Sequence, residues 1–436
     1  MLFISSCRVS RTNACLVGRF ALQVIHYEKE HAHCCDGSSF STNSRQNANN
    51  PAIEVKLNAK TQPALSTYIT NYRCSKSEIS QHFISDVGHL YTIPPVDFHK
   101  MVCKETNTCG FTSPYLKLTD TLKEATMIVR QPGLEIVNYL KHTDYTAPVN
   151  RYLVHGETGC GKSMILQYVT HYCMQQGWLI VPSYNLWRWL DYSSRHKPKQ
   201  RQEVNESFWN NSRVDVPHRA AWWLETFKCI NGSMLDSIHT SQDYSWSKHD
   251  SSPSGTSFMT LMDIGKSRSR YATDIIGCIM KEIRVQDQAN MPKVLVVADC
   301  INAIFGETRL KFKHGQLLHC DQLSFLYNLK KLITSSWCNG AIVMATNSAC
   351  DMRWKNNVKG SHPYDLLGEK GFNAIDPHIP VHVGNYTNKE VLTLLAYYRD
   401  CKWLTGRSLT ASGENEIMQL SCNNPADLDF ICSHAY

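Results

Sequence analysis

One stretch decides the fold class of this 436-residue chain: Gly156-Glu157-Thr158-Gly159-Cys160-Gly161-Lys162-Ser163. It matches the P-loop pattern GxxxxGK[ST], whose glycines let the backbone bring its N–H groups against phosphate oxygens. The lysine then places a compact cation on the β- and γ-phosphates, and the final hydroxyl ligates Mg²⁺. The alternative is a glycine turn with an incidental lysine, so the flanking sequence has to decide.

The residues before and after this stretch have the hydrophobic patterns of a strand and of a helix, which phosphate binding by a P-loop requires. An apolar strand is predicted over 151–155, and apolar residues at helical spacing follow over 165–173. A second strand is predicted over 178–181, ended by Pro182. Strand, glycine turn, helix and strand open a βαβ unit. The stretch is therefore interpreted as a P-loop.

Further apolar runs indicate a parallel sheet. Residues 294–298, 341–345 and 379–383 are almost continuously apolar, which is typical of strands buried on both faces. A helix is predicted over 272–284. The sequence thus predicts an α/β fold, with a parallel sheet flanked by helices.

Other regions have weaker patterns. Residues 88–95 are expected to form a short extended arm, and 123–139 either two helices or one helix kinked at Pro132-Gly133. Residues 185–258 are expected to be an irregular insertion rich in tryptophan and serine. From Asn388 the chain turns helical, and we interpret this end as a small lid.

Two candidate residues outside the loop follow predicted strands. Asp299 comes directly after 294–298, and we expect it to supply the carboxylate of a neighbouring strand to Mg²⁺, together with Ser163. An ordinary strand-end cap is the alternative role for Asp299. Thr346 and Asn347 follow the next strand, and Asn347 is a candidate sensor of the γ-phosphate. A plain strand-end turn explains them almost as well.

The residues expected for rapid hydrolysis are missing. AAA-like ATPases usually carry Glu or Asp directly after the strand-end carboxylate to activate water, and this chain has Cys300. Related ATPases often place an arginine in the lid helix that follows Asn424-Pro425, where this chain has Ala426, Asp427 and Asp429. We expect nucleotide binding with slow or no turnover, and we assign no catalytic residue.

The N-terminus resembles a targeting segment. The first 27 residues contain Arg8, Arg11 and Arg19 and no acidic residue, which fits a mitochondrial transit peptide; a merely disordered end is the alternative. Residues 36–63 are rich in Ser, Asn and Gly. The predicted organisation is a transit peptide (1–35), a flexible linker (36–86), a P-loop nucleotide-binding domain with an N-terminal arm and insertions (87–385), and a C-terminal helical lid domain (386–436).

Composition narrows the class further. No uncharged apolar run approaches the ~18 residues that span a bilayer, so no integral membrane association is expected. Eighteen cysteines are scattered, with no CxxC and no zinc-site spacing of Cys and His, so reduced thiols are expected. A formal charge of +7, from 45 basic and 38 acidic residues, permits a nucleic-acid partner without demanding one.

Three basic clusters are candidate RNA contacts, with a solvated face as the alternative for each. The first extends from Arg188 to Arg201 and has Trp187, Trp189 and Tyr192 among its charges. The other two are Arg309, Lys311 and Lys313, and Arg353, Lys355 and Lys359.

With these motifs in hand, the sequence resembles the death-associated protein three family of the mitochondrial small ribosomal subunit. The resemblance runs from about residue 89 to 436 and is carried by 89–94, 128–130, 151–163, 272–274, 299–303 and 368–380. It implies an AAA-like P-loop NTPase domain with an N-terminal extension and a small helical C-terminal domain. It also implies guanine nucleotide (GTP or GDP), and a place in the mitochondrial matrix among small-subunit ribosomal RNA and neighbouring ribosomal proteins.

Three hypotheses stay open from the sequence. The chain is a structural ribosomal protein holding a slowly hydrolysed nucleotide, an active AAA-like ATPase that remodels protein or nucleic acid, or a switch in apoptosis signalling, a role reported for the family. Cys300 and the missing lid arginine favour the first over the second. No NKxD-type motif is evident, so GTP over ATP rests on the resemblance alone.

Overall fold

The computed structural model describes residues 71–106, 108–190, 204–285, 291–312, 315–348 and 361–434. The chain divides into two compact units, Met1–Thr61 and Gln62–Tyr436, and every described residue belongs to the second. The predicted transit peptide and most of the predicted linker lie outside the described residues.

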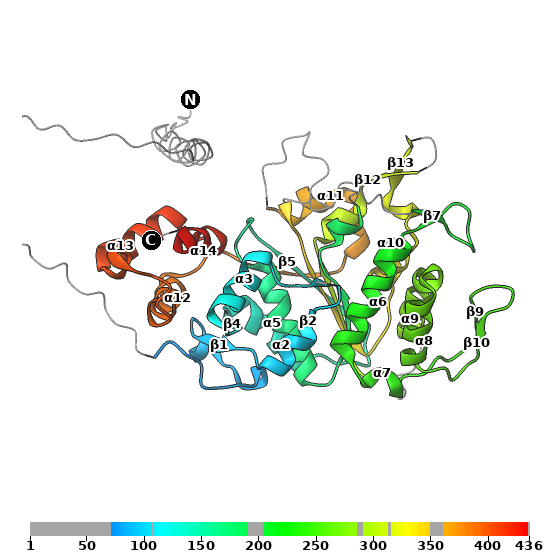
Figure 1. Ribbon diagram of the computed structural model, residues 1–436, viewed down its shortest axis with the longest axis horizontal. Coiled ribbons are helices and arrows are strands. Elements are labelled where there is room, and N and C mark those ends of the chain that lie inside the picture. The colour runs from blue at the N-terminus through cyan, green and yellow to red at the C-terminus, as the bar shows by residue number, and fades with distance from the viewer. Residues whose placement is uncertain are drawn as a thin grey trace, which may run out of the picture. The chain divides into compact units, whose positions relative to one another are not determined.

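A five-stranded parallel sheet forms the centre of the second unit (Figure 1). Its order is β15-β5-β14-β11-β6, and all neighbours run parallel. The strands are β5 (Asn150–His155), β6 (Leu179–Ser183), β11 (Val294–Asp299), β14 (Gly340–Ala345) and β15 (Ile379–His382). These confirm the predicted α/β fold with its parallel sheet. One detail differs, because β14 separates the P-loop strand β5 from β11, which carries Asp299.

Side chains of β11 alternate between two cores, as the two-residue period of a strand requires. Val294, Val296 and Ala298 face one hydrophobic cluster. Leu295 and Val297 face the other. Helices cover both faces, so the apolar run is buried throughout, as the sequence predicts.

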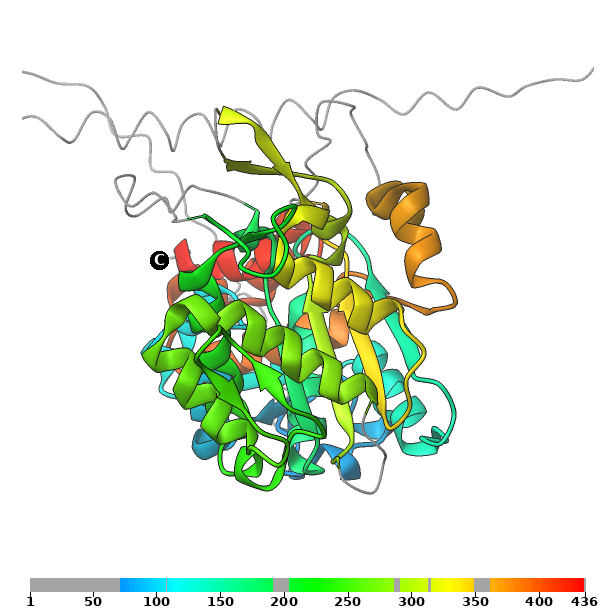
Figure 2. The same ribbon diagram turned by 90° about the vertical axis from the view of Figure 1, so that its right-hand side faces the viewer.

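The first cluster includes side chains of α6 (Pro217–Asn231), α8 (Phe258–Ser267), α9 (Ala272–Val285) and α10 (Ser324–Thr334), seen in front of the sheet in Figure 2. The second includes side chains of α4 (Gln131–His142) and of α5 (Lys162–Gln175), which follows the P-loop. α11 (Pro363–Ile375) precedes β15.

Residues 71–86, which the sequence assigned to the linker, instead pack on the domain. Ile79 is fully buried in η1 (Ile79–Gln81), and His82 Nδ1 lies 2.7 Å from the Tyr168 hydroxyl on α5. The prediction of a linker was wrong here because scattered single anchors leave no apolar period. The next elements along the chain are η2 (Ile84–Asp86), β1 (Leu90–Thr92), α2 (Pro95–Met101), β2 (Val102–Cys103), β3 (Thr108–Cys109) and α3 (Ser113–Leu122).

Two other local predictions were wrong. In 123–139 the chain forms strand β4 (Thr126–Ile128), antiparallel to β1, and then α4. Pro132 lies in the first turn of α4, where its missing N–H costs no helical bond, so it starts a helix instead of kinking one. The insertion expected to be irregular contains the 15-residue α6, again begun by a proline.

Short elements complete the insertions. They are η3 (Leu186–Trp189), β7 (Asn205–Glu206), β8 (Val214–Asp215), α7 (Met234–Ser237), β9 (Tyr244–Ser245), β10 (Ser251–Ser252), η4 (Ser269–Tyr271), η5 (Ile301–Phe305), β12 (Glu307–Lys311), β13 (Leu317–His319) and η7 (Cys320–Gln322). Figure 2 shows the yellow hairpin of β12 and β13 extending beyond the helices.

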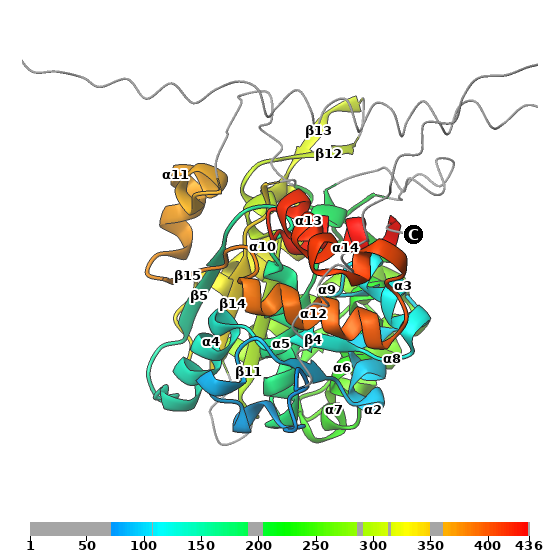
Figure 3. The same cartoon turned by 90° about the vertical axis from the view of Figure 1, so that its left-hand side faces the viewer.

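The C-terminal residues form α12 (Asn388–Asp400), η10 (Gly406–Leu409), α13 (Ala411–Ser421) and α14 (Pro425–His434), which lie together in Figure 3. They share a third hydrophobic cluster with Tyr72, Leu90 on β1 and Ile128 on β4. These N-terminal residues and the C-terminal helices therefore stabilise each other. Among the described helices, none has both the length and the apolar character needed to cross a membrane.

Candidate nucleotide-binding site

The P-loop turns between β5 and α5 through backbone angles that favour glycine. Gly156, Gly159 and Gly161 have φ of +152°, +84° and +98°. A Cβ on Gly156 would lie 2.1 Å from the Val383 carbonyl oxygen, and one on Gly159 would lie 2.5 Å from Asn424 Oδ1. The loop is thus held between the end of β15 and the start of α14, and only glycine fits these two positions.

Lys162 lies buried inside the loop. Its Nζ donates hydrogen bonds of 2.9 Å and 2.6 Å to the carbonyl oxygens of Gly156 and Glu157. The first turn of α5 contains no acidic residue, so nothing within that turn opposes the partial positive charge of the helix N-terminus. A cation, open backbone N–H groups and a helix start thus converge, as phosphate binding requires.

Ser163, in the first turn of α5, meets Asp299, at the end of β11, although β11 is not adjacent to the strand β5 that precedes the loop. Ser163 Oγ donates a 2.7 Å hydrogen bond to Asp299 Oδ2, and the backbone N–H of Cys300 donates to Oδ1 at 2.8 Å. Burial raises the pKa of the Asp299 carboxyl, whereas the hydrogen bond from Ser163 lowers it. A hydroxyl and a carboxylate in contact beside a lysine are a donor set that suits Mg²⁺, which binds through few protein oxygens plus phosphates.

Cys300 is buried next to Asp299 with a left-handed φ of +61°. Its Sγ accepts a hydrogen bond from Asn347 Nδ2 at 3.7 Å, so the thiol contacts the candidate sensor. The backbone of Asn347 is fixed by Asn302, which accepts from its N–H at 2.9 Å and donates to its carbonyl at 3.0 Å. The structure therefore places Asn347 next to Cys300, the residue that follows the strand-end carboxylate of Asp299. The position after Asp299 thus carries a thiol and not a second carboxylate.

The loop also contacts the end of β14. The Thr158 hydroxyl is hydrogen-bonded to the Ser348 hydroxyl. Thr346, between β14 and Asn347, is fully buried, and its Oγ1 has no hydrogen-bond partner among the described residues. A buried hydroxyl without a partner is costly unless something satisfies it, which fits a polar ligand at this end of the sheet.

Arg130 is a site residue that sequence reasoning missed. Its Nη1 donates to the carbonyl of Cys160 in the P-loop at 2.7 Å. Its Nη2 donates to the carbonyls of Gly384 and Asn385 after β15, and its Nε to Glu390 on α12 at 3.1 Å. One buried guanidinium therefore ties the loop to the C-terminal helices. No local pattern predicts these contacts, because the partners are far apart in the sequence.

Asn424, also missed, directly precedes α14, the helix in which an arginine was sought. Its Nδ2 donates to the Thr158 carbonyl at 3.0 Å, and its Oδ1 accepts from the N–H of Ala426 at 3.0 Å. The Ala426 N–H also donates to the Gly159 carbonyl at 3.2 Å. The signal was present in the sequence, since Asn before Pro at a helix start is a typical cap. Its second role, on the P-loop, was not predictable.

Comparison with known proteins identifies the family. The family model of mitochondrial ribosomal death-associated protein 3 matches residues 127–429. The chain belongs to this family. The resemblance seen in the sequence is thereby confirmed.

Two curated relatives of this death-associated protein 3 family member are each named small ribosomal subunit protein mS29. The relative from Mus musculus is 33% identical over 83% of this chain and 89% of its own length. The relative from Bos taurus is 32% identical over 82% of this chain and 85% of its own length. A solved chain titled "Structure of E. coli MS115-1 HORMA:CdnC:Trip13 complex" is 11% identical over 76% of this chain and 80% of that chain, with a TM-score of 0.27, too low to support any conclusion.

The family match spans the whole candidate site. It begins inside β4, just before Arg130, and ends inside α14, just after Asn424. It therefore includes the P-loop, Asp299 and both residues that connect the loop to the C-terminal helices.

The predicted basic clusters are only partly described. Arg188 lies in η3, and Arg309 and Lys311 are exposed on alternate positions of β12, with the Arg309 guanidinium 5.0 Å from the Trp187 ring. The remaining predicted RNA contacts, Arg195, Lys197, Lys199, Arg201, Lys313, Arg353, Lys355 and Lys359, lie outside the described residues.

Proposed function

We propose that this chain is a structural protein of the mitochondrial small ribosomal subunit that binds guanine nucleotide and Mg²⁺ through its P-loop, with slow or no hydrolysis. Membership of the family and the names of the relatives support the ribosomal part and a location in the mitochondrial matrix. The 2.7 Å contact between Ser163 and Asp299 carries the nucleotide part, because it assembles the Mg²⁺ donors beside the lysine.

Each residue would have a defined task when nucleotide is bound. The backbone N–H groups of the loop and the start of α5 would hold the phosphates, and Lys162 would neutralise their charge. Ser163 and Asp299 would hold Mg²⁺, which neutralises phosphate charge when bound. Thr346 and Asn347 are placed to contact the terminal phosphate. The preference for guanine rests on the family resemblance, and competition between GTP and ATP tests it.

We propose slow hydrolysis because Cys300, and not a carboxylate, follows Asp299. Hydrolysis needs a base that activates water, and Cys300 is buried and hydrogen-bonded to Asn347 instead. No arginine lies at the start of α14 to stabilise charge on the transferred phosphoryl group. Turnover at about 1 s⁻¹ or faster, within the common range for enzymes, would favour the alternative of an active AAA-like ATPase.

A bound nucleotide would stabilise more than the loop itself. Arg130 and Asn424 join the P-loop to α12 and α14, so ligand binding should also tighten the C-terminal helices. A ligand that binds only the folded state stabilises it by about 2.7 kcal/mol at a hundredfold excess over Kd. We therefore propose a structural role for the nucleotide.

Ribosomal RNA and neighbouring ribosomal proteins are the proposed partners. The exposed Arg309 and Lys311 on the β12–β13 hairpin support an RNA contact, since basic side chains bind phosphates without sequence preference. No described residue bears on the apoptotic role that the resemblance implies, and it forms no part of this proposal.

Co-sedimentation tests the ribosomal part. The endogenous protein should migrate with mitochondrial small subunits on a sucrose gradient at moderate salt. The double variant Arg309→Ala, Lys311→Ala should reduce this association, and Lys117→Ala, an exposed lysine of α3, should leave it unchanged. Endogenous protein that stays at the top of the gradient would contradict the proposal.

A further inference from the structure

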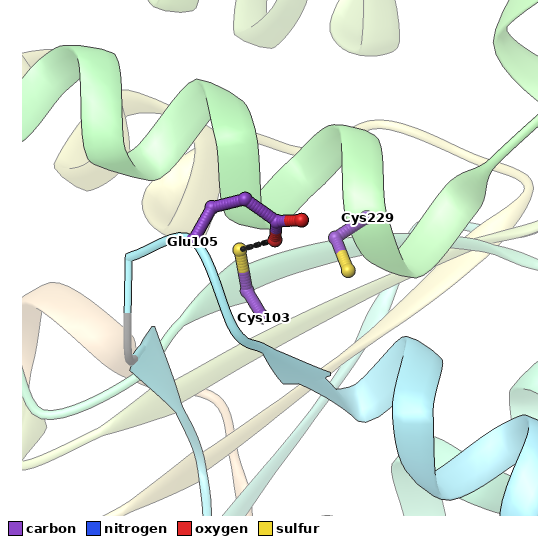
Figure 4. Close-up of side chains that lie close together, drawn as sticks. All are labelled: Cys103, Glu105 and Cys229. Atoms are coloured by element: carbon purple, nitrogen blue, oxygen red, sulfur yellow. Dashed lines mark hydrogen bonds between the residues drawn. The ribbon is translucent and has the colours of Figure 1, made fainter.

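Three metal-ligating side chains that are not part of the P-loop lie close together (Figure 4). Cys103 ends β2, Glu105 lies in the turn that joins β2 to β3, and Cys229 lies on α6. Their ligand atoms, two sulfurs and a carboxylate oxygen, all lie within 4.8 Å of one another. No zinc-site spacing is visible in the sequence, because the fold assembles this cluster from two distant segments.

The distances agree with the edges of a tetrahedral site. Zinc lies about 2.3 Å from a thiolate sulfur and about 2.0–2.2 Å from a carboxylate oxygen, so neighbouring ligand atoms are roughly 3.5–3.8 Å apart. Cys103 Sγ lies 3.4 Å from Glu105 Oε2, close to such an edge. The Cys229 sulfur lies within 4.8 Å of both other ligand atoms, so metal binding would require it to move closer by at most about 1 Å.

We propose that Cys103, Glu105 and Cys229 bind a zinc ion that fastens the β2–β3 hairpin to α6. Two sulfurs and one oxygen favour a borderline-soft cation over Mg²⁺ or Ca²⁺, which take oxygen ligands. Cys103 is 1% exposed, which distinguishes this cluster from a group of surface carboxylates. A fourth ligand is available from water, or from the His99 carbonyl, whose oxygen lies 4.0 Å from Cys229 Sγ.

The charge of the site is consistent with this ion. Two thiolates and a carboxylate outweigh the two positive charges of zinc by one. Lys104, the neighbour of Cys103 and Glu105 in the sequence, adds a positive charge beside the site, whereas Lys266 already pairs with Glu225 at 3.5 Å. A disulfide between Cys103 and Cys229 is the main alternative, but it gives Glu105 no role.

The ion would join two parts of the fold. The hairpin belongs to the N-terminal segment, and α6 packs on α8, α9 and β6. Binding requires both segments in place, so the free energy of metal binding adds to the free energy of folding. The expected role is structural and independent of nucleotide.

Cobalt titration of the nucleotide-free, reduced, full-length protein tests the proposal. Because Cys34 and Cys35 are adjacent in the sequence and lie next to His31 and His33, the background should carry Cys34→Ser and Cys35→Ser, so that these thiols cannot contribute to the cobalt signal. Co²⁺ should bind with one equivalent and give a thiolate-to-cobalt absorption band that Zn²⁺ abolishes. Elemental analysis of protein purified without chelator should find about one zinc per chain.

Variants make the test specific. Cys103→Ser and Cys229→Ser should lose the band, and Glu105→Gln, at an exposed position, should weaken Co²⁺ binding by about tenfold or more while the protein stays folded. Cys338→Ser, an exposed cysteine outside the cluster, should bind as the background does. Zn²⁺ should raise the melting temperature of the background and of the Cys338 variant, and should leave that of Cys103→Ser and Cys229→Ser unchanged. An unchanged band in Cys229→Ser, or a Cys103–Cys229 disulfide with no Co²⁺ binding after reduction, would overturn the proposal.

Discussion

The guanidinium of Arg130 and the carboxylate of Glu390 form a buried ion pair, with Nε 3.1 Å from Oε1 and both side chains less than a tenth exposed. The same guanidinium holds the P-loop through Cys160, so the pair connects the loop to the first C-terminal helix. Glu390 also accepts a hydrogen bond from the backbone N–H of Thr387 at the start of α12.

Glu390→Ala should destabilise the protein by about 3 kcal/mol or more, because it leaves a buried guanidinium without its counter-charge. Urea denaturation measures the change. The control is Asp263→Ala, which removes the partner of Lys228 in a largely exposed pair and should cost less than about 1 kcal/mol. Equal losses in the two variants would show that the Arg130 pair has no special role.

The parallel sheet could be predicted from the sequence, whereas this ion pair could not. The strands and the glycine turn between β5 and α5 were predictable, because apolar runs and a glycine-lysine pattern are local features of the sequence. Arg130 and Asn424 were not, since their function depends on which distant carbonyl groups the fold brings to them. Likewise, residues 71–86 are attached to the domain by single buried side chains such as Ile79, which produce no hydrophobic periodicity in the sequence.

Asn424→Ala should weaken nucleotide binding as well as stability. It removes the cap of α14, worth about 0.5–2 kcal/mol, and also the contact with the Thr158 carbonyl. Thr410→Ala is the matched control, because Thr410 caps α13 through the N–H of Gly413. Both variants should melt earlier, but only Asn424→Ala should bind GTP and Mg²⁺ more weakly by calorimetry. Equal affinities would mean that α14 does not support the loop.

Gly159→Ala should abolish the thermal stabilisation that GTP and Mg²⁺ provide. Its Cβ would collide with Asn424 Oδ1 and adopt a left-handed φ, so the loop must move. Gly177→Ala has a similar φ of +71° but open space around its Cβ, so it should cost only about 1 kcal/mol of strain and keep the nucleotide effect. Differential scanning fluorimetry with and without nucleotide distinguishes the two. A full nucleotide shift in Gly159→Ala would argue against the site.

Asp274 should contribute stability that is lost as pH rises from about 4 to 7. Burial, and then the nearby Asp215, raise the pKa of Asp274 to about 7, whereas an unfolded aspartate has a pKa near 3.9. Between these values the folded state holds a proton that the unfolded state has lost. The contribution of Asp274 to the free energy of unfolding therefore decreases by up to about 1.4 kcal/mol per pH unit in this window and levels off above it.

Asp274→Asn should flatten that slope, because the amide has no proton to lose in this range. Urea denaturation at pH 5, 6 and 7 measures it. Asp263→Asn, on a largely exposed carboxylate, should keep the slope of the wild type. A variant of Asp274 as pH-dependent as the wild type would contradict the assignment.

Isothermal titration calorimetry with GTP and Mg²⁺ tests the central claim most directly, that the P-loop holds a guanine nucleotide. Lys162 is the one lysine within the loop sequence, and its ammonium lies among the loop carbonyls. The wild type and Lys117→Ala should bind one equivalent of GTP, and Lys162→Ala should show no measurable binding while remaining folded by circular dichroism. Undiminished affinity in Lys162→Ala, or no binding by the wild type, would contradict the account.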